Sequence, residues 1–241
     1  MLRAIDISNW QKGFEIRNNG EFSLVIVKAT QGTSYTSETL DEQARACMKC
    51  GIPLGLYHFA DGGEWKSEAD HFIAAAKAYL PYACFIALDW ESYAVQKGVS
   101  WAEKWLEYVA KKTGIAPHIY MSASVTNAYD WSSVADKFPL WVAAYQSAKP
   151  IKTGAWSECS MWQYSSSYHV SYDTRNLDAS KIYDEGIIDM NLNDKLSDNA
   201  HSVRYVLDRF TDMGSSKLGE RLTAIEKDLA EIKALVEKIS K

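Results

Sequence analysis

The sequence predicts an α/β fold, because apolar segments of strand length alternate with amphipathic helical segments along much of its 241 residues. Strands that are apolar along their whole length are typical of a parallel sheet buried on both faces. After residue 122 the strand-like segments follow one another more closely, with few helical patterns between them. The sequence therefore predicts an irregular TIM-like β/α barrel with incomplete helices, followed by a C-terminal α-helical tail.

Eight segments carry the strand pattern: 2–8, 23–29, 53–59, 84–91, 117–122, 140–145, 160–165 and 186–191. Three segments between the earlier strands have helical periodicity: about 38–50, 65–80 and 101–113. Gly51 and Gly114 are expected to end the first and third helices as C-terminal caps. Ser100 is expected to cap the start of the third.

The composition changes near residue 196, which predicts two domains. All nine tryptophans precede this point, and only Tyr205 and Phe210 follow it among the aromatic residues. The acidic and basic residues after it balance, so the first part carries the whole net charge of −5. We expect a catalytic-sized barrel at 1–196 and a helical tail at 197–241.

Charge and apolar content argue against two classes of partner. A net charge of −5 and a pI of about 5.6 provide no basic surface for nucleic acid or an anionic membrane. The apolar stretches are far shorter than the roughly 20 residues of a membrane span, so no membrane insertion is expected. The first residues, MLRAIDISNW, lack the pattern of a secretion signal. We therefore expect a protein that is made in a cytoplasm and that, if it acts outside the cell, is released by another agent.

The four cysteines are expected to be free thiols. Cys47 and Cys50 form a C-x-x-C pair, but the pair lies at the end of a predicted helix, where the helix dipole raises a thiol pKa. No further pair of ligands follows at a zinc-site spacing. The sequence thus predicts neither a metal nor another cofactor.

Four acidic residues fall at the C-terminal ends of three predicted strands: Asp6, Asp89, Glu91 and Asp189. The C-terminal ends of the strands of an α/β barrel meet at one rim, so these acids are expected to share one mouth. Asp89 and Glu91 are two residues apart and should point to the same side of their strand. A single acid at a strand end often serves only as a cap, but the agreement of three strands favours a functional site.

Clustered carboxylates serve either metal binding or glycoside hydrolysis. An oxygen-ligand site for Mg²⁺ or Ca²⁺ is one alternative, but the sequence has neither a glycine-rich phosphate loop nor an EF-hand loop. Glycoside hydrolysis needs one protonated carboxyl group and one ionised carboxylate. Repulsion from Asp89 and Asp6, with partial burial, would raise the pKa of Glu91 and keep it protonated near neutral pH.

Aromatic residues at or just past the predicted strand ends fit a sugar substrate. They are Trp10, Trp90, Trp141, Trp162, Tyr57, Tyr145 and Tyr164. Pyranose rings pack their C–H faces on aromatic side chains, while polar groups fix their orientation. Because aromatic residues are mostly found in cores, about half of the seven are expected to line a cleft.

Seven motifs, in order along residues 4–192, resemble glycoside hydrolase family 25, the lysozymes (muramidases) of phage endolysins and bacterial autolysins. They are DIS at 6–8, KATQG at 28–32, GLYHF at 55–59, DWE at 89–91, LWVAAY at 140–145, WQYS at 162–165 and IDMN at 188–191. The resemblance implies a flattened β/α barrel with incomplete helices. It also implies hydrolysis of the β-1,4 bond between N-acetylmuramic acid and N-acetylglucosamine in bacterial peptidoglycan, without a cofactor.

The resemblance also implies residue roles. Glu91 matches the general acid, and Asp89 matches a partner acid that orients the substrate acetamido group if that group is the internal nucleophile. Asp6 and Asp189 match the remaining acids, in stabilising or water-activating roles. Residues that match the lining of the sugar subsites are Tyr57, His58, Tyr145, Trp162 and Tyr164, and Trp10 is added as an aromatic at a strand end. Whether the nucleophile is the acetamido group or a carboxylate stays open.

The tail carries a heptad pattern over residues 218–239. Leucine and valine recur at the a positions 222, 229 and 236, and leucine and isoleucine at the d positions 218, 225, 232 and 239. The flanking pairs Arg221–Glu226 and Asp228–Lys233 are complementary between parallel chains. We expect a homo-oligomeric coiled coil, with trimer or tetramer favoured over dimer. The alternative is an amphipathic helix that packs on its own barrel.

Two other functions stay open beside a muramidase of the phage endolysin type. The cleft could belong to a catalytically silent module that binds cell-wall sugars, although the intact acids argue against it. The heptads could instead belong to a self-assembling structural protein in which the acids are incidental.

Overall fold

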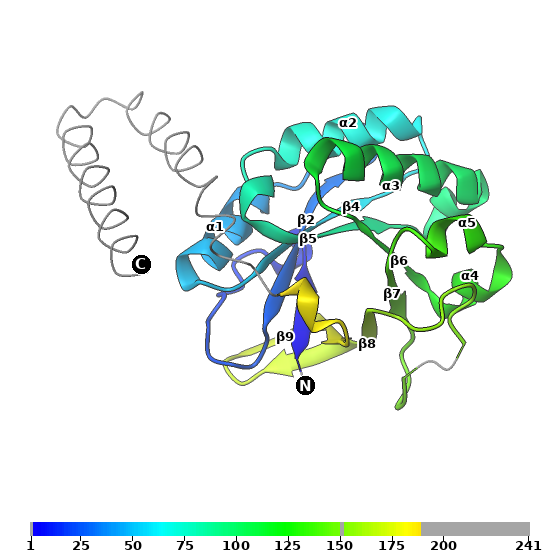
Figure 1. The fold of residues 1–241 in the computed structure, drawn as a ribbon. Coiled ribbons are helices and arrows are strands. Elements are labelled where there is room, and N and C mark those ends of the chain that lie inside the picture. Colours follow the sequence, from blue (N-terminus) through cyan, green and yellow to red (C-terminus); the bar gives the residue numbers. More distant parts are fainter. Residues whose placement is uncertain (1, 150–151, 189–241) are drawn as a thin grey trace, which may run out of the picture. The chain divides into compact units, whose positions relative to one another are not determined.

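Seven parallel strands and one antiparallel strand close into a barrel (Figure 1). The structure is a computed structural model that describes residues 2–149 and 152–188. The parallel strands follow one another around the barrel in chain order: β1 (Arg3–Ile7), β2 (Leu24–Gln31), β4 (Leu54–Phe59), β5 (Ala83–Asp89), β6 (His118–Ser122), β7 (Leu140–Ala143) and β8 (Met161–Val170). The antiparallel strand β9 (Asp173–Ile182) pairs with both β8 and β1 and closes the barrel. The predicted fold class is confirmed.

The helices are unevenly distributed around the barrel, as predicted. They are α1 (Leu40–Cys50), α2 (Trp65–Ala76), α3 (Val99–Thr113), α4 (Ala123–Ala128) and α5 (Ser132–Ala135), with 3-10 helices η1 (Asn9–Gln11), η2 (Leu80–Tyr82), η3 (Ser92–Lys97) and η4 (Glu185–Ile187). Figure 1 shows α2 and α3 side by side outside the barrel, whereas the β8–β9 hairpin carries no helix. None of the helices within the described ranges is long and apolar enough to cross a bilayer.

Two glycines end their helices as the sequence predicts. Gly51 after α1 and Gly114 after α3 adopt the left-handed conformation, with φ of 67° and 73°. The predicted start of α3 is wrong, because the helix begins at Val99 and Gly98 occupies the N-cap in place of Ser100. The two-residue strand β3 (Tyr35–Thr36), which pairs with the end of β2, was not predicted.

The prediction of a last strand at 186–191 is wrong for residues 186–188, the part that the structure describes. Glu185–Ile187 form η4 instead, because the Asp184 carboxylate accepts a hydrogen bond from the Gly186 N–H at 3.0 Å and stabilises a tight turn. The strand that closes the barrel is β9, which the sequence analysis did not predict. Its alternating polar and apolar residues lack the wholly apolar pattern of the parallel strands.

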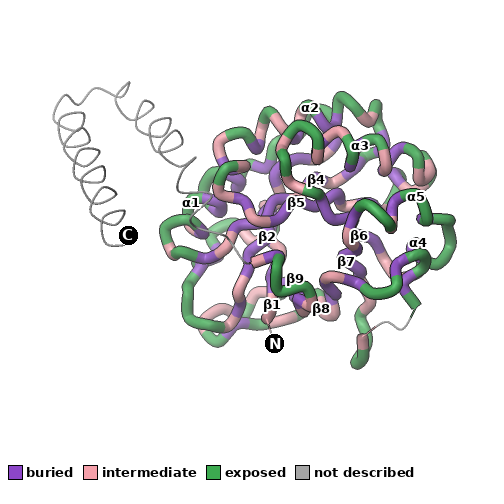
Figure 2. The backbone as a smooth tube through the Cα atoms, viewed as in Figure 1, coloured by how far each residue is buried: buried purple, intermediate pink, exposed green. Residues whose placement is uncertain are grey.

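Alternation along the strands divides the core into two layers. On β2, Leu24 and Ile26 belong to the cluster inside the barrel, together with Phe85, whereas Val25 and Val27 belong to the cluster that packs against the helices. Figure 2 shows buried residues along the barrel strands and exposed residues on the outer sides of the helices. The barrel sheet is therefore buried on both faces where helices cover it, which explains the apolar strand segments.

The cysteines are free, as predicted: Cys47, Cys50, Cys84 and Cys159. Burial raises the pKa of the Cys47 thiol to about 12, so this thiol of the C-x-x-C pair carries no reactive thiolate at neutral pH. The pair is a structural feature of α1.

The described residues all fall within one compact unit, residues 1–190. The predicted domain boundary at 196, the helical tail at 197–241 and the heptad segment 218–239 lie outside the described residues. All three stay predictions.

Gly55 provides a test of packing inside the barrel. A Cβ atom at this position of β4 would lie 3.0 Å from Ile26 Cγ1 and 3.1 Å from Phe85 Cδ1 on the neighbouring strands. Gly55→Val is therefore expected to lower the free energy of unfolding by about 1–3 kcal/mol through overpacking, measured by denaturant titration. Thr36→Val on exposed β3 is the control and is expected to stay within about 0.5 kcal/mol of wild type. Wild-type stability of Gly55→Val would contradict this packing.

Candidate active site

A cleft of about 300 Å³ opens where the parallel strands end. Its described lining contains four acids, six aromatic residues and one lysine among other residues: Asp6, Ile7, Ser8, Trp10, Gln11, Lys28, Tyr57, Phe59, Asp89, Glu91, Tyr120, Trp141, Tyr145, Gln163 and Asp178. Its volume is at the lower end of the roughly 300–1,000 Å³ typical of small-molecule sites. The C-terminal rim is also where α/β barrels place their reacting groups.

The four acids come from three strands. Asp6 lies on β1, Asp89 ends β5, and Glu91 follows two residues later, with Trp90 between them buried on the helix side. Asp178 lies on β9 directly opposite Asp6 in the antiparallel register. The structure thus brings Asp6, Asp89 and Glu91 into one cleft and adds an acid that the sequence analysis missed.

Asp178 is the fourth acid of the described cluster, whereas the sequence predicts Asp189 as the fourth acid of the site. Asp189 lies outside the described residues, so its position is not part of this geometry. The C-terminal ends of parallel strands do not include Asp178, which lies in the middle of an antiparallel strand. The alternation of Leu177, Asp178, Ala179 and Ser180 is the signal that could have placed this carboxylate inside the barrel.

Gln163 holds Asp6 in place. Its amide nitrogen donates to Asp6 Oδ2 at 3.0 Å, and its amide oxygen accepts from the hydroxyl groups of Tyr120 and Tyr145, both at 2.9 Å. Gln163 itself is 2% exposed, so these bonds leave its amide little freedom. The sequence analysis selected Trp162 and Tyr164 in the WQYS motif and missed the glutamine between them.

Burial is the main cause of the raised pKa values in the cluster. It raises the pKa of Asp6 and Asp89 well above their ordinary values, and repulsion from neighbouring acids adds to the effect. Burial also raises the pKa of Glu91, and burial with repulsion from Glu91 raises the pKa of Asp178 to about 6. The expected repulsion thus acts on the neighbours of Glu91, whereas burial accounts for Glu91 itself. The cluster retains protons at pH values where surface carboxyl groups are ionised.

One oxygen of the cluster has no hydrogen-bond partner among the described groups. Asp89 Oδ1 is buried and receives no donor. A buried acceptor without a donor is costly, and such atoms concentrate where a ligand supplies the missing bond. Asp89 is therefore prepared to accept a hydrogen bond from a bound molecule.

Three of the predicted substrate-binding residues line the cleft. Tyr57 lies on β4, Tyr145 follows β7 with 60% of its surface exposed, and Trp10 lies on η1 with 85% exposed. Ser8 fixes η1 as a capping box with Gln11, which presents the Trp10 ring at the mouth. Including Trp141, four of the seven aromatics named from the sequence line the cleft, close to the expected half.

The other predicted substrate-binding residues do not line the cleft. His58 is fully buried on the helix side of β4, where its ring stacks on Trp105 with centroids 5.4 Å apart. Trp162 and Tyr164 point away from Gln163 on β8, and the ammonium of Lys181 lies over both rings, 5.0 and 5.2 Å from their centroids. Strand alternation is the physical reason, because neighbours of an inward residue point outward.

Trp162 nevertheless supports the cleft. Its indole N–H donates to the Ala144 carbonyl at 2.7 Å and so fixes the segment that carries Tyr145. Among the described residues no group of three or more histidine, cysteine, aspartate or glutamate side chains has the arrangement of a metal site.

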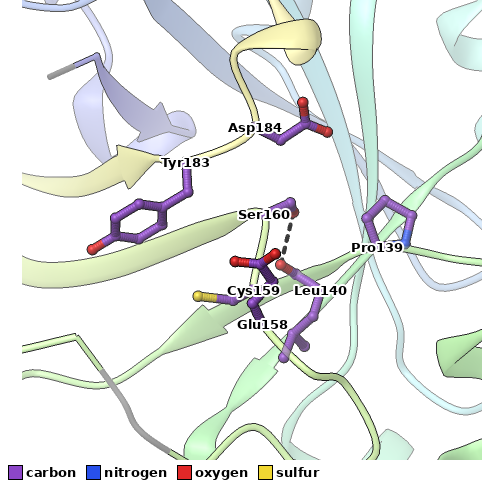
Figure 3. A pocket seen from close by; sticks show the side chains of 7 residues that line it. All are labelled: Pro139, Leu140, Glu158, Cys159, Ser160, Tyr183 and Asp184. Atoms are coloured by element: carbon purple, nitrogen blue, oxygen red, sulfur yellow. Dashed lines mark hydrogen bonds between the residues drawn. The ribbon is translucent and has the colours of Figure 1, made fainter.

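A second cavity of about 360 Å³ lies at the opposite end of the barrel (Figure 3). Its polar groups are Glu158, Cys159, Ser160, Tyr183 and Asp184. Ser160 Oγ donates to the Leu140 carbonyl at 2.8 Å, and Asp184 accepts from a backbone N–H, so these groups stabilise local turns. Although this cavity is slightly larger, it lies at the end of the barrel away from the clustered acids, and we assign the site to the acidic cleft.

The closed α/β barrel with acids gathered at its C-terminal rim places the protein in the class of barrel glycoside hydrolases. A model of the family described as "Glycosyl hydrolases family 25" matches residues 5–172. The chain therefore belongs to glycosyl hydrolase family 25.

Relatives of known name agree with this family. The autolytic lysozyme of Clostridium acetobutylicum is 27% identical over 195 residues, which cover 78% of this chain and 57% of that protein. The chain thus spans little more than half the length of this curated relative. A family 25 lysozyme of Aspergillus fumigatus superposes with a TM-score of 0.66 at 27% identity, covering 75% of this chain and 93% of that one. The catalytic domain of endolysin ply40 from bacteriophage P40 of Listeria monocytogenes has a TM-score of 0.64 at 25% identity, covering 78% and 95%.

Asp178→Asn is expected to stabilise the fold at pH 7.5 but not at pH 4. Because the folded pKa is raised from 3.8 to about 6, the carboxylate costs no stability below about pH 3.8 and its full amount above about pH 6. The side chain is partly exposed and screened, so the expected gain is about 1 kcal/mol, measured by unfolding at both pH values. Asp136→Asn on the exposed surface is the control. An equal gain at both pH values would contradict the electrostatic origin.

Proposed function

We propose that the protein is a muramidase that cleaves the β-1,4 bond between N-acetylmuramic acid and N-acetylglucosamine in bacterial peptidoglycan. The observation that carries the proposal is the gathering of Asp6, Asp89, Glu91 and Asp178 in one cleft of a family 25 barrel. The names of the relatives, an autolytic lysozyme and a phage endolysin among them, support this substrate.

Glu91 is the proposed general acid. Burial raises its pKa, which favours the protonated form that can transfer a proton to the oxygen of the departing sugar. Its backbone is extended, and the next residue, Ser92, is the one described non-glycine residue with positive φ, at 53°. This uncommon conformation occurs where the chain enters η3, directly after Glu91, whose side chain lines the cleft.

Asp89 is the proposed partner acid. Its unpartnered Oδ1 is suited to accept the N–H of a substrate acetamido group, which would orient that group beside the sugar C1 atom. Asp6, held by Gln163, and its neighbour Asp178 then stabilise positive charge in the oxocarbenium-like transition state or activate water. This arrangement supports the acetamido group as the internal nucleophile, a role that the sequence left open. Asp189 keeps its proposed role as a further acid of the cleft.

The exposed rings at the mouth are the proposed sugar platforms. Trp10 and Tyr145 come from two separate segments of the rim, η1 after β1 and the segment after β7. Pyranose C–H faces pack on such rings and lose little side-chain entropy in doing so. Tyr57 is also proposed to contact the substrate, lower in the cleft. His58, Trp162 and Tyr164 are assigned supporting roles, since they lie outside the lining.

The biological setting that we propose is that of a phage endolysin. The similarity to the ply40 catalytic domain supports this setting, and the protein would be made in the host cytoplasm and reach the wall after release.

Glu91→Gln is expected to lower the rate of wall clearing about 10²- to 10⁴-fold, because the amide cannot supply the proton. The measurement is the turbidity of purified Gram-positive walls. Glu42→Gln on the exposed face of α1 is the matched control and should clear walls at the wild-type rate. Full activity of Glu91→Gln would remove its proposed role. Failure of the wild type to clear walls would favour a silent sugar-binding module.

Mass spectrometry of the products of the same digest identifies the bond that is cut. Reducing-end N-acetylmuramic acid supports a muramidase. Reducing-end N-acetylglucosamine would instead assign the protein as a glucosaminidase, with the same acids acting on the other linkage.

We also propose that the heptad segment 218–239 assembles the protein into a trimer or tetramer. Leucine at two a positions and isoleucine at three d positions favour these states over a dimer. Several cleavage units on one particle would bind a polymeric wall with greater avidity without any new contact.

Two charges at d positions, Ile225→Glu with Ile232→Glu, are expected to convert the oligomer to single chains in light scattering, because buried charges destabilise the core of the coiled coil. The control pair Lys227→Glu with Ala234→Glu changes f positions, which face solvent, and should keep the oligomer mass. A wild-type mass equal to one chain would contradict the proposal.

A further inference from the structure

Lys28 carries the only positive charge among the described residues that line the cleft. It lies near the end of β2, with Tyr57 beside it in the parallel register of β4. Its side chain is about half-buried among the acids, and neither the motif comparison nor the proposed mechanism gives it a role. A partly buried lysine is costly unless its charge is used or compensated.

The ammonium group of Lys28 is fixed by contacts with Gln31 and Phe59. Its Nζ atom donates to Gln31 Oε1 at 2.7 Å and lies 4.7 Å from the centroid of the Phe59 ring. Gln31 Nε2 in turn donates to Asp61 Oδ1 at 3.0 Å. Gly32 permits this contact, because a Cβ atom there would lie 2.5 Å from Asp61 Oδ2. The lysine is therefore connected to the loop after β4.

That loop is fixed by a buried, hydrogen-bonded pair of side chains behind the sheet, Glu68 and His58. Glu68 of α2 accepts backbone N–H groups from Asp61 at 3.2 Å and Gly63 at 2.5 Å, and its Oε2 lies 2.9 Å from His58 Nε2. The other ring nitrogen of His58 bonds Thr30 on β2 at 2.8 Å. The side chains of His58 and Glu68 are both 0% exposed, so this part of the chain has little freedom to move.

A β-bulge in β2 lets two residues of this strand, Lys28 and Thr30, face opposite sides of the sheet. The register with β4 shifts between Lys28 and Thr30. Lys28 consequently faces the cleft, while Thr30, two residues later, faces His58 on the other side of the sheet, contrary to the usual alternation. Bulges commonly redirect a side chain next to an active site.

We propose that Lys28 is a positioning residue whose ammonium charge determines how the proton is shared between Asp89 and Glu91, and that the contacts Gln31–Asp61–Glu68–His58 fix this charge in place. The proposal deepens the muramidase function and rests on it for its effect on catalysis. Lys28 acts through the acids, and no contact with the sugar is required.

The charges around Lys28 agree with this role. The acids whose charges act on it are Asp89 and Glu91, which line the same cleft, and Asp61 on the loop after β4. The phenols near it are Tyr57, its register partner on β4, and Tyr35. Lys28 opposes the increase in pKa that burial causes in Asp89 and Glu91. Without this cation both acids would stay protonated to a higher pH, and no carboxylate would be available beside the general acid.

The test is the pH profile of wall clearing by the full chain. Lys28→Met should move both limbs of the profile to higher pH by about one unit, because loss of the cation raises the pKa of both acids. Lys28→Arg keeps the charge and should keep the wild-type limbs. Lys181→Met, which removes a lysine on the outer side of β9, is the matched control and should also keep them. Lower activity of Lys28→Met at every pH with unmoved limbs would show a merely structural role and overturn the proposal.

A second measurement does not depend on activity. Titration of the carboxyl carbons by ¹³C NMR should show higher midpoints for Asp89 and Glu91 in Lys28→Met than in wild type, and intermediate ones in Gln31→Leu, where the ammonium remains but is not fixed. Unchanged midpoints in Lys28→Met would overturn the proposal even if the wild type clears walls. Raised midpoints in a protein that does not clear walls would support the role of Lys28 while refuting the muramidase function. Wild-type midpoints in Gln31→Leu would refute the fixing contacts. Lys28→Gln replaces Lys28→Met if the latter fails to fold.

Discussion

Like-charge repulsion among buried carboxyl groups is the constraint on which this site depends. Burial of four acids in one cleft raises their pKa values, and repulsion adds to the effect at Asp6, Asp89 and Asp178, which costs folding free energy at neutral pH. The acids therefore stay together only if the backbone does not let them separate. A closed barrel makes the backbone rigid, because each barrel strand is hydrogen-bonded to a neighbour on both sides and the barrel has no free edge that could move apart. The antiparallel strand β9 therefore shapes the acidic cleft as well as the fold, since it both closes the barrel and contributes Asp178 opposite Asp6.

The remaining polar groups of the cleft make this repulsion tolerable without removing it. The Gln163 amide gives Asp6 one donor and is itself fixed by two tyrosine hydroxyls, so Asp6 is oriented but not neutralised. Lys28 supplies one positive charge against four acids. Full compensation would lower every pKa and remove the proton donor, whereas no compensation would leave every acid protonated. A cluster in which one positive charge faces several acids can contain a protonated carboxyl group and an ionised carboxylate at the same pH.

Much of the barrel was predictable because parallel strands buried on both faces must be apolar along their length. Segments such as 23–29 and 84–91 therefore identified β2 and β5, and helices ending in Gly51 and Gly114 identified the crossovers. Strand β9 could not be found by that rule, since its outer face carries no helix and its sequence is half polar. Asp178 was missed for the same reason. Its role follows from which strand lies between β8 and β1, a long-range property that no local pattern encodes.

The short motifs were informative for position but misleading for side-chain direction. In each of them neighbouring residues face opposite sides of a strand, so the motif contains both a cleft residue and its support. Tyr57 faces the cleft while His58 binds Glu68 behind the sheet, and Gln163 faces the cleft while Trp162 bonds the segment that carries Tyr145. A chemically conspicuous residue such as a histidine or tryptophan attracts a catalytic or binding interpretation, yet here it stabilises the strand from the other side. The physical requirement on such a motif is therefore twofold. One face must present the reacting group, and the other must hold the strand still enough for a cluster of repelling acids to keep its geometry.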